Sequence, residues 1–172
     1  KNPPKKPLIV VPADHETGGM ALGTGRYALN LKALENQKAS AEELSKKISD
    51  LRKAKNNHVA WEDVKNLLSE QMGFWSVLPI SWEQEKKLRD EYEKSFVKNK
   101  VEFAESMYAK TEPMAAKAKE VMDQIAMVGW TSGGHSAGYV PVFAIGAGSD
   151  LFIGKMDNTE IPRRIAKAGG YK

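Results

Sequence analysis

The sequence contains no cysteine, and this absence narrows the chemistry open to the protein. Without thiols there can be no disulfide framework, no thiolate ligand for zinc and no cysteine nucleophile. Long apolar runs are also missing, since none approaches the roughly 18 residues that a membrane-spanning helix requires. With 41% hydrophobic and 28% charged residues among 172, the composition predicts a water-soluble chain with a sizeable core and no membrane role.

A concentrated basic patch is missing as well, although the net charge is +4. Residues 26–127 hold 18 basic and 17 acidic side chains, so this long stretch is nearly neutral. The positive excess comes from the two ends of the sequence, and charges of opposite sign alternate along the rest. A nucleic-acid-binding protein gathers its basic residues on one face. The sequence therefore predicts a solvated surface and no nucleic-acid partner.

The order of sequence patterns divides the chain into three parts. Residues 7–25 carry an apolar β-branched run and a glycine-rich loop, residues 26–127 are mostly helical, and residues 128–172 return to β-type sequence before a closing helix. Strands separated by helices indicate an α/β fold. We expect residues 1–25 and 128–172 to form one α/β core, with 26–127 as a large α-helical insertion.

The helical part is punctuated by clear start and stop signals. Ser40 with Glu43, and Ser81 with Gln84, have the spacing of capping boxes. Gly73 suits a helix end. Thr111 followed by Pro113 predicts the start of the last helix of this part. One apolar stripe continues from the second capping box through Leu88, Tyr92, Phe96, Phe103 and Met107.

Further elements are predicted in the last part of the chain. The runs 140–145 and 151–153 have the composition of strands. The final helix is expected to begin after an Asp157-Asn158 cap and to end at Gly169-Gly170.

Histidine is scarce, yet two of the three histidines stand in glycine-rich turns. Asp14 and His15 follow the predicted strand 8–11, and two glycines close their turn. His135 ends the segment GWTSGGH. A carboxylate and imidazoles at a strand end, among glycines that allow close backbone approach, are typical of a catalytic metal site. His58 lies between helices and is interpreted as an ordinary loop residue.

These two segments resemble the alkaline phosphatase family. Residues 10–19, VVPADHETGG, are similar to the family pattern in which a strand ends at T-A-D-H-[ED]-T-G-G, with Pro12 in place of the usual threonine. Residues 129–138, GWTSGGHSAG, match its G-W-[TS]-[TS]-G-G-H segment. The resemblance covers roughly 65 residues at the two ends. It implies the C-terminal part of an alkaline-phosphatase-like sheet fold.

The resemblance also implies two zinc ions and a nearby magnesium ion, acting on phosphate monoesters through a phosphoryl-enzyme. Asp14 and His15 would bind the zinc next to the nucleophile, and His135 would bind the other. The family's nucleophile and further ligands lie upstream of these segments, so we expect this chain alone to be inactive. A homodimer, a periplasmic or secreted location, and a signal peptide in the preceding sequence are likewise implied by resemblance.

Other functions remain open from the sequence. Ser132 and Ser136 flank His135, but a serine nucleophile would need a separately placed acid, and the G-x-S-x-G elbow is missing. The longer protein to which this chain would belong could instead be a related metal hydrolase of the sulfatase or phosphopentomutase type. From a different class, the helical part could be a non-catalytic lid or oligomerisation module.

Overall fold

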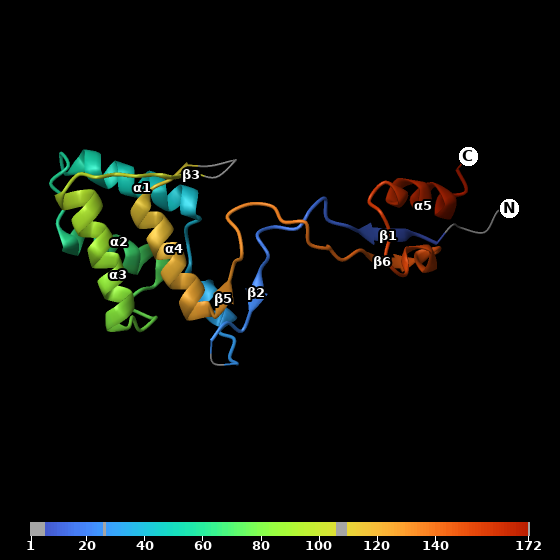
Figure 1. Cartoon of the computed structure of the whole chain (residues 1–172), viewed down its shortest axis with the longest axis horizontal. Helices are drawn as coiled ribbons and strands as arrows, with labels where there is room; N and C mark the ends of the chain where they lie inside the picture. Colours follow the sequence, from blue (N-terminus) through green and yellow to red (C-terminus); the bar gives the residue numbers. More distant parts are fainter. Residues whose placement is uncertain (1–5, 26, 106–109, 172) are drawn as a thin grey trace. The chain divides into compact units, whose positions relative to one another are not determined.

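The computed structural model describes residues 6–25, 27–105 and 110–171, which form two compact units (Figure 1). One, the split unit, combines the residues up to Gly19 with those from His135 onward. The other, the helical unit, is the continuous stretch Met20–Gly134. The strand pair closest to the predicted boundaries, Ala21–Leu22 with Val128–Gly129, belongs to the helical unit. That residues 26–127 are an insertion stays a prediction.

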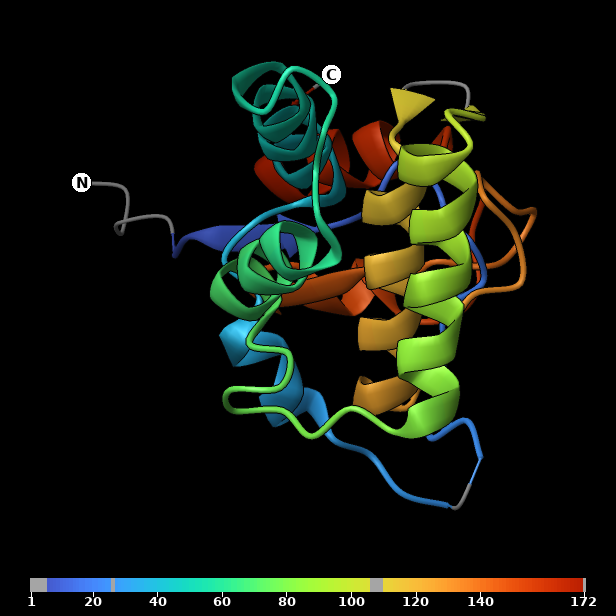
Figure 2. The same cartoon turned by 90° about the vertical axis from the view of Figure 1, so that its left-hand side faces the viewer.

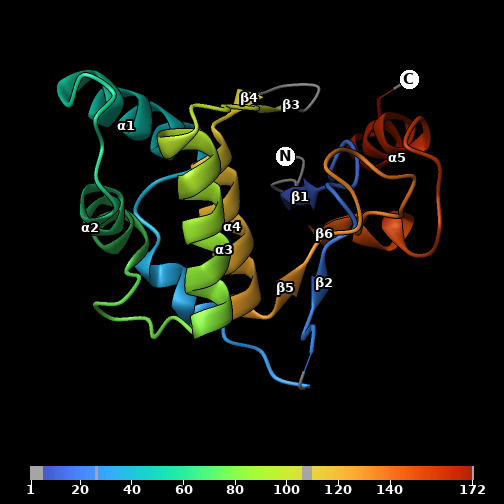
Figure 3. The same cartoon turned by 60° about the vertical axis from the view of Figure 1, so that its left-hand side comes forward.

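The helical unit packs its helices around α4. Figures 2 and 3 show α3 and α4 side by side, and α1 also contacts α4. In chain order its elements are β2 (Ala21–Leu22), η1 (Leu31–Asn36), α1 (Ala41–Ala54), α2 (Trp61–Met72), α3 (Trp82–Tyr92), the π-helical turn η2 (Glu93–Val97), β3 (Ala104–Glu105), β4 (Lys110–Thr111), α4 (Pro113–Ala126) and β5 (Val128–Gly129).

The predicted helix signals are confirmed where they depend on local chemistry. At the start of α1 the Ser40 hydroxyl accepts the Glu43 N–H at 3.1 Å, which is one of the two hydrogen bonds of the predicted capping box. Ser81 and Gln84 form the reciprocal capping box that begins α3. Gly73 ends α2 with φ 72°, a left-handed conformation that glycine adopts without a steric penalty.

The start of α4 corrects one prediction. Pro113 is its first residue, as expected, but Glu112 caps the helix where the sequence favoured Thr111. One Glu112 carboxylate oxygen accepts the N–H groups of Met114 at 2.7 Å and Ala115 at 3.2 Å. A carboxylate at a helix N-terminus also interacts favourably with the helix dipole.

The predicted apolar stripe stops earlier than expected. Leu88 and Phe96 are buried, and Tyr92 is partly buried against the core. The helical stretch ends at Val97, and Phe103 beyond it is 48% exposed. Met107 lies outside the described residues. The π-helical turn changes the side-chain phase, so a continued 3.6-residue period no longer describes this stretch.

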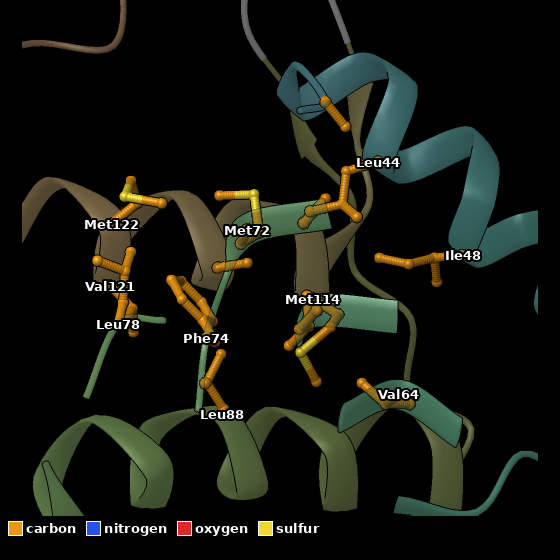
Figure 4. Close-up of a cluster of buried hydrophobic side chains, with 14 of the residues drawn as sticks. Leu44, Ile48, Val64, Met72, Phe74, Leu78, Leu88, Met114, Val121 and Met122 are labelled. Carbon is orange, nitrogen blue, oxygen red and sulfur yellow. The ribbon is translucent and has the colours of Figure 1, made fainter. Parts of the chain in front are cut away.

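One hydrophobic core fills the helical unit. Figure 4 shows side chains from α1, α2, α3 and α4 converging around Phe74, which is fully buried. The labelled members are Leu44, Ile48, Val64, Met72, Phe74, Leu78, Leu88, Met114, Val121 and Met122. The cluster includes Leu88 and Phe96 of the predicted apolar stripe, and Tyr92 packs against it.

The split unit contains a two-stranded antiparallel ribbon, which a 3₁₀ helix and an α-helix follow. β1 (Leu8–Val11) pairs with β6 (Phe143–Gly146), so that Val11 lies opposite Phe143. η3 (Ser149–Phe152) and α5 (Glu160–Gly169) follow (Figure 1). The combination of small sheets and helices confirms the α/β class. Within the described ranges, no helix is both long and apolar enough to cross a bilayer.

Two strand predictions in this unit were wrong in detail. The strand expected over 140–145 begins only at Phe143. Residues 151–153 were expected as a strand, but Leu151 and Phe152 belong to the 3₁₀ helix η3. Gly148, at φ 82°, reverses the chain just before η3, and the Leu151 N–H bonds back to the Gly148 carbonyl at 3.1 Å. This turn decides the local conformation in spite of the apolar composition of residues 151–153.

The closing helix agrees with its predicted limits to within two residues. The Asp157 carboxylate accepts the N–H of Thr159 at 2.9 Å and its hydroxyl at 2.7 Å, just before α5 begins. Gly170 ends the helix in a left-handed conformation.

Candidate metal centre

Asp14 and His15 lie in the turn that follows β1. The strand ends at Val11, and Gly18 and Gly19 turn the chain with φ values of 76° and 60°. The His15 N–H donates to Asp14 Oδ1 at 3.0 Å, which ties the carboxylate to its neighbour. The turn therefore holds both side chains together at the end of the strand.

The hydrogen bond at His15 Nδ1 defines the tautomer. Nδ1 lies 2.8 Å from the backbone carbonyl oxygen of Glu16, and a carbonyl can only accept. Nδ1 therefore carries the proton, and a neutral ring keeps its lone pair on Nε2. Histidine ligands are commonly oriented in this way by a carbonyl bound to the other ring nitrogen.

The Nε2 atom of His15 lies 3.5 Å from Asp14 Oδ2. Two donors bound tetrahedrally to zinc at 2.0–2.2 Å lie about 3.4 Å apart, so this separation suits a shared ion. The Asp14 side chain is 88% exposed and that of His15 37% exposed, so both are accessible from solvent. The donor pair fits a zinc ion in chemistry and in spacing.

His135 lies against His15 although the two are far apart in sequence. Their imidazole rings are stacked, with centroids 3.4 Å apart and planes 22° apart. The structure thus brings together all three predicted metal ligands, Asp14, His15 and His135. Their role as ligands stays a prediction. Within residues 6–25, 27–105 and 110–171, no three His, Asp or Glu side chains form a group that could hold one metal ion.

A second contact between these loops was not predicted from the sequence. The Ser136 hydroxyl donates to Glu16 Oε2, and the Gly19 N–H donates to Oε1 at 2.5 Å. Ser136 Oγ also accepts the Gly138 N–H at 3.2 Å. Glu16 follows His15 in the sequence and Ser136 follows His135, and this proximity to predicted ligands is the one sequence signal that points to the contact. Nothing local indicated that the two would meet.

The alternative nucleophile receives no support from its surroundings. The exposed Ser132 hydroxyl donates to the Gly134 carbonyl at 2.8 Å, and Ser136 is bound to Glu16. Neither contact involves a histidine, the usual general base for a serine nucleophile. His58 is exposed in the loop between α1 and α2, as expected for an ordinary loop histidine.

Comparison with known proteins identifies relatives over nearly the whole chain. The model of the family described as alkaline phosphatase matches residues 1–171. Alkaline phosphatase 3 of Bacillus subtilis (strain 168) is 30% identical over 97% of the chain, and alkaline phosphatase 4 of the same organism is 25% identical over 95%. The chain spans only 31% and 30% of the length of these relatives.

A solved structure shares the fold. The crystal structure of a cold-active alkaline phosphatase from the psychrophile Shewanella sp. superposes with a TM-score of 0.61 and 24% identity. The match covers 93% of this chain and 33% of the Shewanella chain. The family model extends through the helical unit as well as through both loops that carry the predicted ligands, and the chain belongs to the alkaline phosphatase family.

Proposed function

We propose that this chain forms part of a zinc-dependent alkaline phosphatase that hydrolyses phosphate monoesters. The observation that carries the proposal is the Asp14–His15 donor pair, whose Oδ2 and Nε2 atoms lie 3.5 Å apart with Nδ1 bonded to a carbonyl. Family membership supplies the reaction class. Because the named relatives are phosphatases, the sulfatase and phosphopentomutase alternatives receive less support.

Each predicted ligand has a distinct role in this proposal. Asp14 and His15 would hold one zinc ion, and His135 would contribute to the second. When bound, such a pair of ions stabilises charge on the entering and leaving oxygens of a phosphoryl transfer. A magnesium ion is implied by the family resemblance, and we assign none of the residues of this chain to it.

The proposal places the nucleophile outside these 172 residues. A catalytic zinc usually has three protein ligands of its own, so three candidates are too few for two ions. The relatives are about three times as long as the matched region. We therefore expect this chain alone not to hydrolyse esters, although the Asp14–His15 pair should still bind zinc. A homodimer and a periplasmic or secreted location also belong to the proposal, by resemblance.

The experiment compares zinc binding and ester hydrolysis in four chains. Calorimetric titration with zinc should show binding to the wild type, strong loss in His15→Ala and in His135→Ala, and no change in His58→Ala. His58→Ala is the matched control because this third histidine lies in an exposed loop of the helical unit. Equal zinc affinity in all four chains would contradict the proposed ligands.

Assays with p-nitrophenyl phosphate test whether this chain alone lacks the nucleophile. The zinc-loaded wild type is expected to be inactive while its circular dichroism shows a folded chain. Zinc-dependent hydrolysis that disappears in the histidine variants would mean that the nucleophile lies within the chain, contrary to the proposal.

A second candidate is that the helical unit acts as a non-catalytic lid or oligomerisation module. It is one continuous stretch with its own core. It also has an apolar pocket of about 510 Å³, whose lining includes Met20, Leu22, Leu31, Leu34, Val128 and Trp130. For an oligomerisation role, sedimentation should show self-association that Leu31→Asp abolishes and that zinc does not change. A monomer at all concentrations would exclude that role.

A further inference from the structure

The Glu16 side chain joins the two loops that carry the predicted metal ligands. One carboxylate oxygen accepts the Ser136 hydroxyl, and the other accepts the Gly19 N–H of its own loop at 2.5 Å. Hydrogen bonds to an ionised carboxylate are shorter and about twice as strong as those between neutral groups. The side chain therefore links the two loops through both of its oxygen atoms.

The chain is shaped to allow this contact. A Cβ atom at Gly138 would lie 3.1 Å from Glu16 Cγ and 3.2 Å from Ser136 Oγ. Both distances are shorter than ordinary van der Waals contact. The glycine leaves the space that the carboxylate and hydroxyl occupy, and its own N–H completes the arrangement by donating to Ser136 Oγ at 3.2 Å.

The backbone hydrogen bonds between β1 and β6 do not extend to the two loops that Glu16 joins. The β1–β6 pairing ends at Val11 and Phe143, and residues 12–19 and 135–138 are not in strands. Side-chain contacts therefore contribute to the relative position of the loops. Glu16 acts on both sides, since its backbone carbonyl fixes His15 Nδ1 and its carboxylate holds Ser136, the neighbour of His135.

We infer that Glu16 is a positioning residue that sets the distance between His15 and His135 through its bond to Ser136. The inference rests on the proposed metal site and adds to it a residue that is not itself a ligand. Outer contacts that orient metal ligands are worth about 10–100-fold in metal affinity. The Glu16–Ser136 bond should have an effect of this size.

The test measures the ring contact first without metal. In the metal-free full chain, nuclear Overhauser contacts between the His15 and His135 ring protons should be present in the wild type. They should be lost in Glu16→Ala and in Ser136→Ala, and kept in Ser132→Ala, whose hydroxyl bonds only locally. Glu16→Gln keeps one of the two acceptor oxygens, so it should weaken the contact less than Glu16→Ala does. Retention of the ring contact in both Glu16→Ala and Ser136→Ala would overturn the inference.

Metal binding provides the second readout. Zinc affinity should fall about 10–100-fold in Glu16→Ala and in Ser136→Ala. The double variant should bind zinc no more weakly than either single variant, because both changes remove the same Glu16–Ser136 interaction. The visible spectrum of the Co²⁺-substituted chain should shift in the same variants and not in Ser132→Ala. Wild-type affinity in both single variants would overturn the inference. A wild type that binds no zinc would overturn the proposed function, while the metal-free ring contact would still decide the role of Glu16.

Discussion

The Arg52 guanidinium lies 2.8 Å from the carboxylate of Glu112 in the interior of the helical unit. The Glu112 side chain is 1% exposed and that of Arg52 14% exposed. Arg52 also donates to the Ser95 carbonyl at 3.1 Å and lies 3.6 Å from the centroid of the Phe96 ring. Because the same carboxylate caps α4, this pair ties α1, η2 and α4 together.

We expect Glu112→Ala to destabilise the helical unit by about 3–5 kcal/mol, because it leaves the Arg52 charge buried without its partner. Removing the helix cap is part of this loss. Urea unfolding followed by tryptophan fluorescence measures the effect, since all four tryptophans lie in this unit.

The control for this prediction is Asp90→Ala, which breaks the exposed Lys86–Asp90 pair and should change stability by less than about 1 kcal/mol. Similar losses in the two variants would show that burial of the Arg52–Glu112 pair has no special effect.

Glu91 should make the stability of the helical unit depend on pH. Burial raises the pKa of this carboxyl, the positive charge of Lys94 opposes the shift, and the negative charge of Glu112 adds to it. Its Oε1 atom is buried without a hydrogen-bond partner in the part of the chain that the structure describes. The folded state then holds the proton more tightly than the unfolded state, so stability falls as pH rises from 4.5 through the raised pKa.

The variant Glu91→Gln isolates this effect. We expect it to be more stable than the wild type at pH 7 and to lose that advantage well below pH 4.5, where the wild-type carboxyl is protonated in both states. Denaturant unfolding at several pH values gives the difference. A constant difference across the series would contradict the prediction.

Gly146 allows the β1–β6 ribbon to form at its outer end. Its φ is 109°, and a Cβ atom there would lie 2.0 Å from the Pro7 carbonyl oxygen, which accepts the Ala147 N–H. We expect Gly146→Ala to open this end of the ribbon, with a loss of at least about 2 kcal/mol. Amide exchange of β1 residues measures the opening.

The matched control is Gly154→Ala. Gly154 also has a positive φ, 88°, but nothing lies within 4 Å of the added Cβ atom. This variant carries the backbone strain without the clash. If it opened the ribbon as much as Gly146→Ala, the contact with Pro7 would not explain the effect.

Zinc should stabilise the split unit if the proposed ligands are correct. Binding only to the folded state contributes about 2.7 kcal/mol when free zinc is at 100 times its Kd. Thermal unfolding of the split unit should shift upward on adding zinc, return on adding a chelator, and stay unchanged in the Asp14→Ala/His15→Ala variant. A zinc-induced shift that persists in this variant would place the ion elsewhere.

Features that depend on a few neighbouring residues were predictable from the sequence. The Ser81–Gln84 capping box and the left-handed Gly73 are set by local hydrogen bonds and by backbone sterics. The meeting of His15 with His135 followed only from resemblance to a family, because their own periodicity and spacing do not specify a contact across the chain.

Features that depend on distant contacts were missed. Glu112 caps α4 while its own N–H bonds to Ser45 Oγ at 3.0 Å and its side chain pairs with Arg52, and no pattern near Thr111 signals these partners. The Glu16–Ser136 bond is of the same kind. At residues 151–153, the apolar composition predicted a strand, but the turn at Gly148 decided the local conformation.

The division of the split unit has a consequence for the order of folding. His15 leaves the ribosome before the whole helical unit is made, and at about 5–20 residues per second it waits on the order of ten seconds for His135. Within the helical unit, Ala21 pairs with Gly129, so the first and last strands of this unit are neighbours once it has folded. Bringing the loops of His15 and His135 together then costs less conformational entropy than it would in an unfolded chain, where the whole segment between the two histidines has to be closed into a loop. Mutations that slow folding of the helical core should thus delay assembly of the histidine pair, even though they touch neither imidazole.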